Sequence, residues 1–308
     1  MRLALWIALL IVCAFLLFQQ LRHPQIKLNP ISSRILHPLD TRLHYRIGEI
    51  DPRFQLSQNE IQQLTQQATE IWQNGTGRTL FVYDPKAQLS INFIYDERQN
   101  QTNLRIKQQT QIQVSQAQQH RQQQFIDTEK QAIQQSKAFI DQKQAELQSA
   151  VVQYNQIIKQ INQHGGAEPA LKERLEQQKF DLEQRKQALS LAVQAHNQTV
   201  AESNRHVAYY NQNNQAIDQS IQHYNQRYAA KMFDKGLFNG KEINVYEFEN
   251  KDDLRLVLAH ELGHALGLKH VEDNPKALMY PILKQQNIQS FELTNSDLAL
   301  LKQHSYGL

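Results

Sequence analysis

The clearest chemical potential in this sequence lies in three histidines and one glutamate near its C-terminal end. In a helix, His260 and His264 lie one turn apart on the same face, so both imidazoles can reach one metal ion. His270 is the natural third ligand, because catalytic zinc sites use three protein ligands and leave a fourth position for water. Glu261 follows the first histidine and can act as a general base toward that water. The pattern predicts one catalytic zinc ion.

A glycine separates the second histidine from the third. A helix that continued past Gly267 would carry His270 away from the metal, whereas a glycine at positive φ can turn the chain back. The alternative is an amphipathic helix whose histidines have no chemical role. His-Glu-x-x-His alone arises by chance in about one such chain in fifty, and the added glycine and third histidine make a chance match roughly a thousandfold rarer.

The motif that starts at His260, His-Glu-x-x-His-x-x-Gly-x-x-His, resembles the elongated zinc motif of the metzincin peptidases. The sequence Ala-Leu-Met-Tyr-Pro at 277–281 resembles their Met-turn, and its residues are most similar to those of the matrixin branch. The resemblance implies that Met279 forms a hydrophobic floor beneath the zinc. It also implies that the segment with Tyr280 and Pro281 helps line the pocket for the residue after the scissile bond. A packing role for Tyr280 is the alternative.

The chain begins with an apolar run from Leu3 to Phe18, which reaches Leu21 when two glutamines are included. This length is just sufficient to cross a membrane. We therefore expect residues 1–22 to be an uncleaved transmembrane anchor, and the family resemblance implies that the catalytic domain lies on the extracytoplasmic side. The alternative is a signal peptide and a secreted enzyme, but no good small-x-small cleavage pattern follows the run.

The cysteine content and the net charge bear on disulfide bonds, on latency and on nucleic-acid binding. Cys13 is the only cysteine and lies in the apolar run, so the rest of the chain cannot form a disulfide. The cysteine that keeps some matrixins latent is also absent. The formal net charge of +3 on 308 residues gives no argument for a nucleic-acid partner. The fold must therefore rely on its hydrophobic core and its metal.

Residues 28–104 predict the first part of the catalytic domain. Alternating apolar residues indicate a strand over 43–53, and a capping box indicates a helix that begins after Ser57. Two more strands are predicted over 80–83 and 89–95, separated by an Asp-Pro turn. Strand, helix, strand, strand is the order in which a matrixin-like catalytic domain begins.

A glutamine-rich insertion follows over 105–228. Apolar residues recur there at spacings of seven or its multiples, and later at alternating spacings of four and three, which predicts a coiled coil. Gly165 and Gly166 separate two arms, so the segment is predicted to be an antiparallel helical hairpin. The seam residues are Ile112, Ile126, Ile133, Ile140, Leu147, Tyr154 and Ile161 in the first arm, and Leu189, Val193, Val200, Val207, Tyr210, Ile217, Ile221, Tyr224 and Tyr228 in the second.

The second seam positions of the first arm are polar, as at Glu129 and Ser136. Either the hairpin is marginal and mobile, or it leaves apolar surface for a second copy or a partner helix. A glutamine-rich disordered linker is the alternative to the hairpin itself. Because the second arm leads into the expected edge strand, where metzincins bind substrate backbone, we expect the hairpin to assist substrate choice.

Residues 229–308 complete the predicted catalytic domain. The last two strands are predicted over 230–233 and 243–248, with Gly236 and Gly240 in the loop between them. The zinc helix and a closing helix follow. The fold class is therefore α+β: a metzincin-like zincin domain with a twisted mixed sheet and an active-site helix, interrupted by an antiparallel coiled-coil hairpin and preceded by a transmembrane helix.

These features predict a membrane-anchored zinc endopeptidase that acts on protein or peptide substrates. The insertion occupies the region where matrixins carry structural metal sites, and it offers no convincing replacement ligands, so a need for calcium stays open. One alternative is a coiled-coil adaptor with a non-catalytic zinc domain, against which the intact Glu261 argues. The other is a structural zinc protein, which would normally supply a fourth Cys or His ligand.

Overall fold

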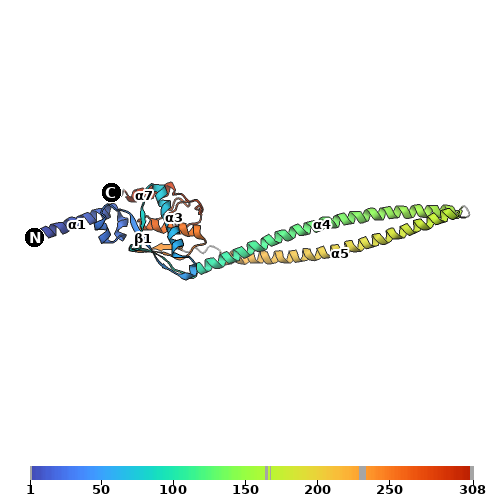
Figure 1. Ribbon diagram of the computed structural model, residues 1–308, viewed down its shortest axis with the longest axis horizontal. Helices are drawn as coiled ribbons and strands as arrows, with labels where there is room; N and C mark the ends of the chain where they lie inside the picture. The colour runs from blue at the N-terminus through green and yellow to red at the C-terminus, as the bar shows by residue number, and fades with distance from the viewer. Residues whose placement is uncertain (1, 164–165, 167, 229–233, 306–308) are drawn as a thin grey trace. The chain divides into compact units, whose positions relative to one another are not determined.

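The computed structural model divides into two compact units. The sheet unit comprises residues 1–107 and 230–308, and the hairpin unit comprises 108–229. Figure 1 shows the strands and shorter helices of the first unit, and the two long helices α4 and α5 of the second lying side by side. The residues that the structure describes are 2–163, 166, 168–228 and 234–305.

The sheet unit is built around a five-stranded mixed sheet with the strand order β2-β1-β3-β5-β4. Neighbouring strands are parallel, except that the edge strand β4 runs antiparallel to β5. The mixed sheet agrees with the predicted fold class. The strands are β1 (Leu43–Ile50), β2 (Phe81–Tyr83), β3 (Leu89–Phe93), β4 (Gly236–Phe238) and β5 (Glu242–Val245).

Two helices pack together and against the sheet to form the core. Helix α3 (Gln58–Thr76) begins with the predicted capping box, in which Ser57 and Glu60 exchange hydrogen bonds. Its buried face includes Ile61, Leu64, Ala68, Ile71 and Trp72, the positions that its periodicity predicts. Helix α6 (Lys251–Ala265) is buried along most of its length. This helix carries the first two histidines of the motif, so the core holds them in place.

The structure corrects the prediction for the edge of the sheet. The strand predicted over 230–233 lies outside the described residues, and β4 instead occupies 236–238, where a loop was expected. The connecting turn is shorter and contains Gly240, whose φ of +93° suits a glycine. A strand of only three residues carries too little periodicity to be recognised from sequence, because its position depends on pairing with β5.

The N-terminal segment forms helix α1 (Arg2–Arg22), the short helix η1 (Pro24–Leu28) and helix α2 (Ile31–Leu36). In the part of the chain that the structure describes, no helix combines the length and the apolar character needed to span a membrane, so the predicted anchor is not supported. The end of α1 is tied to the residues that follow it. Gln19 Nε2 donates to the Pro38 carbonyl at 2.6 Å, and Arg34 Nη2 donates to the Leu16 carbonyl at 2.9 Å.

Helix α4 (Glu97–Gln163) starts within the sheet unit, eight residues before the predicted start of the insertion. Its first turns are fixed there by polar contacts. Gln99 exchanges hydrogen bonds with the backbone N–H and carbonyl of Phe248, and the Thr102 hydroxyl donates to Glu247 at 2.8 Å. The helix is therefore anchored to the segment between β5 and α6 before it enters the hairpin.

In the hairpin unit, α4 packs against helix α5 (Pro169–Arg227) in antiparallel orientation. The predicted turn lies partly outside the described residues, which omit 164, 165 and 167. Ile126, Ile140 and Leu175 are buried, while most other apolar side chains of the seam are half-buried. The two helices thus bury a narrow seam rather than a broad core.

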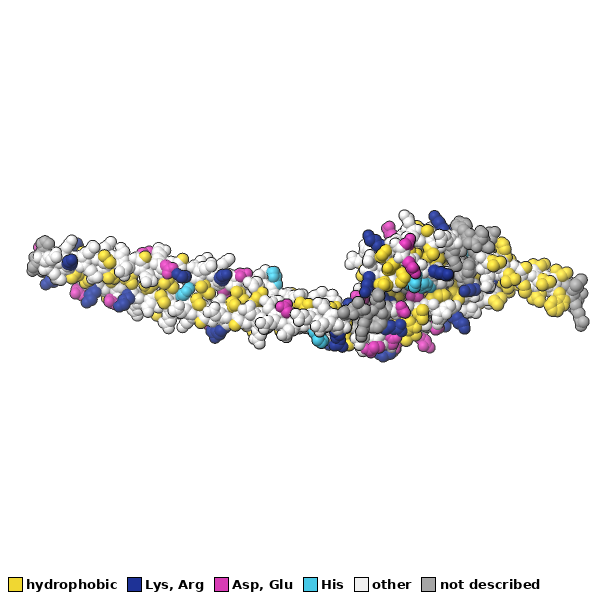
Figure 2. All heavy atoms as spheres, turned by 180° about the vertical axis from the view of Figure 1, so that it is seen from behind, with side chains coloured by type: hydrophobic (Ala, Val, Ile, Leu, Met, Phe, Trp, Pro, Cys, Tyr) yellow, Lys and Arg dark blue, Asp and Glu magenta, His cyan; other side chains and the backbone are white. Residues whose placement is uncertain are grey.

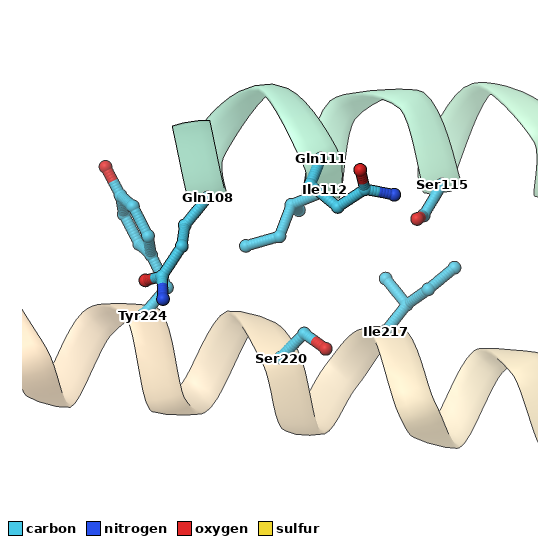
Figure 3. A pocket seen from close by; sticks show the side chains of 7 residues that line it. All are labelled: Gln108, Gln111, Ile112, Ser115, Ile217, Ser220 and Tyr224. Atoms are coloured by element: carbon cyan, nitrogen blue, oxygen red, sulfur yellow. The ribbon is translucent and has the colours of Figure 1, made fainter. Parts of the chain in front are cut away.

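The polar seam positions pair with each other across the hairpin. Ser136 contacts Nδ1 of His196, and Glu129 contacts Nδ1 of His206 at 3.0 Å. Polar layers of this kind select one register, at some cost in stability. Near the open end, a cavity of about 180 Å³ lies between the helices. Figure 3 shows the small side chains of Ser115 and Ser220 among the residues that line it.

Candidate metal centre

Helix α6 and the turn after it bring three imidazoles to one point. His260 and His264 project from successive turns of α6, and Gly267, at φ of +96°, reverses the chain so that His270 returns to them. The Nε2 atom of His264 lies 3.1 Å from Nε2 of His260 and 3.1 Å from Nε2 of His270. Among the described residues, this is the one group of three or more potential ligands close enough to hold a metal ion.

The hydrogen bonds behind the imidazoles determine which nitrogen faces the centre. Nδ1 of His260 lies 2.6 Å from the Leu278 carbonyl, and Nδ1 of His264 lies 2.8 Å from the Leu268 carbonyl. A carbonyl oxygen can only accept, so both Nδ1 atoms must carry the proton. Both Nε2 lone pairs then point toward the centre. This is the arrangement that backbone carbonyls impose on histidines that bind metal.

These residues fit a zinc ion. Two nitrogen lone pairs 3.1 Å apart with no proton between them repel each other, and a cation between them removes that repulsion. Nitrogen ligands about 2.0 to 2.1 Å from a tetrahedral zinc ion lie roughly 3.3 Å apart, close to the observed separation. Burial lowers the pKa of His260 to about 3 and also lowers the pKa of His264, so both stay in the neutral form that binds metal.

Glu261 is buried beside the histidines, against the edge strand. Its Oε2 accepts a hydrogen bond of 2.8 Å from the backbone N–H of Phe238 in β4. Burial raises the pKa of Glu261 to about 7, although the Phe238 N–H favours the charged form. A Cβ atom at Gly236 would lie 2.7 Å from Cγ of Glu261, so only glycine permits this close approach. The carboxylate is thus held at one orientation by the strand.

Beneath the histidines lies the turn predicted from the sequence at 277–281. Met279 is fully buried, and its carbonyl accepts from the N–H of Val271 at 2.8 Å. Its sulfur packs against Gly263 of α6, where a Cβ atom would lie 2.4 Å away. Tyr280 is half-buried and Pro281 is exposed. The turn therefore supports the helix that carries two of the three histidines.

Sequence reasoning missed the residue that fixes this turn. Asp297 is fully buried, and its carboxylate accepts hydrogen bonds of 3.0 Å from the N–H groups of both Leu278 and Met279. Leu278 in turn accepts from His260, so Asp297 positions that imidazole through the backbone. In the sequence, Asp297 reads only as a helix-capping residue three positions after Thr294, and both side chains do make that contact.

Trp72 is the second residue that sequence reasoning did not assign to the site. It fits the periodicity of the buried face of α3, and it is fully buried there. Its indole N–H donates 2.8 Å to the carbonyl of Ala259, the residue before the first histidine, and its ring packs against Gly263. No local signal distinguishes it from an ordinary core tryptophan, because its partner lies 187 residues away.

Comparison with protein families gives a match over most of the chain. The family model described as Matrixin matches residues 39–307, which includes the hairpin as well as both parts of the sheet unit. No solved structure matches the chain significantly.

Several curated proteins match a short part of the chain. Human matrix metalloproteinase-16 is 51% identical over 47 residues, which is 15% of this chain and 8% of that protein. Human matrix metalloproteinase-15 is 44% identical over 52 residues, or 17% of this chain and 8% of that protein. Macrophage metalloelastase of Rattus norvegicus is 44% identical over 55 residues, which is 18% of this chain and 11% of that protein. The chain thus spans about a tenth of the length of these relatives.

Proposed function

Because the chain belongs to the matrixin family, we propose that it is a zinc-dependent endopeptidase that cleaves protein or peptide substrates. His260, His264 and His270 would hold the single catalytic ion, and Glu261 would be the general base. The observation that carries the proposal is the convergence of three Nε2 atoms beside a buried carboxylate. A structural zinc site has no need of that carboxylate.

The protein groups around the site have distinct tasks in peptide hydrolysis. Bound zinc supplies a Lewis acid that lowers the pKa of water and polarises the scissile carbonyl. The N–H of Phe238 holds Oε2 of Glu261, which leaves Oε1 to accept a proton from the attacking water. The same carboxyl group can then donate that proton to the leaving amine. A pKa raised by burial toward neutrality suits a group that must both accept and donate.

The edge strand supports a role in substrate binding. β4 is the outer strand of the sheet, and Leu237 on it is 48% exposed. An extended substrate could add to this edge by backbone hydrogen bonds, as in other complexes formed by strand addition. We further propose that Tyr280 and Pro281 line the pocket for the residue after the scissile bond. The exposure of Pro281 and partial exposure of Tyr280 support this role.

We also propose that the insertion predicted over 105–228 assists substrate choice, while 28–104 and 229–308 form the catalytic domain. Support comes from the chain path: α4 leaves the sheet unit from the segment beside β5, and the chain returns just before β4. A chain in which 105–228 is replaced by a short linker should still cleave a short peptide but should cleave its natural protein substrate poorly. Equal loss of both activities would count against this role.

The decisive test compares the full chain with its Glu261→Ala variant. Zinc per chain is measured together with cleavage of an unstructured protein such as casein. One zinc ion in both proteins, with cleavage by the wild type only, supports the proposal. One zinc ion in both without any cleavage favours the adaptor alternative, and a folded wild type without zinc overturns the proposed site.

Cellular location is a separate proposal. The exposed apolar side chains of α1, including Trp6, Leu10 and Leu17, support attachment of this segment to a membrane. The catalytic domain would then lie on the extracytoplasmic side, or be secreted if the segment is removed. Cell fractionation followed by alkaline extraction tests the attachment, and release of the full-length chain by alkali would contradict it.

A further inference from the structure

We propose that two copies of this chain associate through one flank of the hairpin unit. The exposed apolar side chains on this flank, here called the apolar flank, are Val114, Phe125, Phe139 and Tyr209. They are between 46% and 59% exposed. Figure 2 shows hydrophobic side chains at the surface of the hairpin helices. This inference is independent of the catalytic proposal, because it concerns only the hairpin unit.

The heptad repeat places these four residues on one side. Phe125 and Phe139 lie one position before a main seam residue, and Val114 and Tyr209 lie two positions after one. These two positions are neighbours on the same side of a helix. The seam residues concerned are Ile112, Ile126 and Ile140 in α4, and Val207 in α5.

A contact between two rings joins the two helices on this side. The rings of Phe125 and His206 lie 5.4 Å apart between centroids, so Phe125 leans toward α5. Tyr209 lies three residues after His206 and therefore on the same side of α5. The contacts of Ser136 with His196 and of Tyr224 with Gln109 set the register, which brings Phe125 close to Tyr209. The aromatic side chains of the two helices thus form one surface.

Small side chains lie between the large ones. Ala132 stands midway between Phe125 and Phe139, and Ala195 lies on the facing side of α5. Phe125, Ala132 and Phe139 follow one another at intervals of seven residues. A second copy of the hairpin has the same seven-residue repeat. Large side chains that alternate with alanines allow a neighbouring helix to approach and interdigitate. The flank is therefore shaped for a helix rather than for a small molecule.

Charged residues do not oppose contact between two copies of this flank. The same heptad positions place Arg121 and Glu146 of α4 on the flank, together with Glu202 of α5, which lies 3.9 Å from Arg205. The opposite side of α4 carries Lys130 and Lys137, the second of which pairs with Asp141 at 2.8 Å. The flank therefore carries charges of both signs, which two copies can place against each other.

The area of the flank is sufficient for a stable dimer. The part of α4 between Gln118 and Glu146 is about 40 Å long at 1.5 Å per residue, and two adjacent helices are about 20 Å wide. A face of this size buries roughly 800 Å² per copy, which is typical of specific interfaces. Two hairpins packed in this way form a four-helix bundle, which buries the exposed aromatic side chains.

The test measures the molar mass of the full chain by sedimentation in a mild detergent. The test variant is Phe125→Gln with Phe139→Gln. The matched control is Val152→Gln with Phe180→Gln, which are 45% and 67% exposed but lie on the outer face of the hairpin. Helix content is compared by circular dichroism, so that loss of folding is separated from loss of association.

We expect the wild type and the control to be dimers at about 10 µM, and the flank variant to be a monomer with unchanged helix content. Loss of four buried aromatic rings per dimer should weaken association at least a hundredfold. A wild type that is still monomeric at about 100 µM overturns the proposal. This is the result expected if a different partner, rather than a second copy, covers the flank. A flank variant that remains dimeric, for instance through α1, also overturns it, and so does equal dissociation of the control.

Discussion

The sheet unit and the hairpin unit are stabilised in different ways. Trp72 and Leu258 are fully buried in a core shared by a sheet and two helices, whereas the best buried residues of the hairpin, such as Ile126 and Ile140, belong to a seam one side chain wide. The hairpin compensates with polar pairs that set register rather than add much stability. The metal centre therefore lies in the sheet unit, which can hold it rigidly, and the apolar flank lies in the hairpin unit.

The two units should differ most in the free energy of unfolding that each loses when one aromatic residue is truncated. Trp72→Ala leaves a cavity and removes the indole hydrogen bond to the Ala259 carbonyl, so it should lower the free energy of unfolding of the sheet unit by about 3 to 5 kcal/mol. Phe180→Ala, on the exposed face of the hairpin, should change stability by less than about 0.5 kcal/mol. Urea unfolding of the zinc-free protein measures both, and similar losses would contradict the comparison.

A smaller but still large effect is expected at Asp297. Asp297→Ala leaves the N–H groups of Leu278 and Met279 without their acceptor, at a cost of about 2 to 4 kcal/mol. Because Leu278 also orients His260, zinc affinity should fall by about tenfold or more. The measurements are thermal unfolding and competition with a chelator. In the hairpin, Asp218→Ala is the control, and equal effects would show that Asp297 has no special role.

The third prediction concerns protonation. Burial lowers the pKa of His260 to about 3, whereas an ordinary histidine has a pKa near 6.5. In the zinc-free protein at pH 5, His260 should therefore remain neutral with its proton on Nδ1, and long-range ¹H–¹⁵N spectra can show this. The unfolded chain takes up a proton that the folded chain does not, so stability falls as pH decreases from 6.5 toward 3. A charged His260 at pH 5 would contradict the buried geometry.

The smallest effect is expected from filling the cavity in the hairpin. Ser115→Leu adds apolar volume to the space of about 180 Å³ near Ser220 and Tyr224. The thermal midpoint of the hairpin, followed by circular dichroism, should rise by an amount equivalent to about 1 kcal/mol. Zinc content should not change. A lower midpoint would mean that the seam is already packed to its limit and that the contrast between the units is overstated.

Local patterns were sufficient to identify the parts of the sheet unit that depend on nearby residues. The capping box at Ser57, the buried face of α3 and the three clustered histidines all follow from spacings within one helix or one turn. These features need no knowledge of the rest of the fold, because the residues that make them are neighbours in the chain.

Features that depend on distant partners were missed or misplaced. β4 is three residues long, and its position follows from its pairing with β5 and its contact with Glu261. Asp297 and Trp72 support the site through partners that their own segments do not specify.

The long separation within the sheet has a consequence for how the chain folds. Asn92 of β3 and Asn244 of β5 are hydrogen-bonded neighbours, yet they are 152 residues apart. Closing a flexible loop of that length costs about 2 kcal/mol more conformational entropy than closing one of about 15 residues. The hairpin brings its two ends together, as the contact between Gln109 and Tyr224 shows. A hairpin that forms early therefore removes most of this entropic barrier and lets the two halves of the sheet meet as though they were continuous.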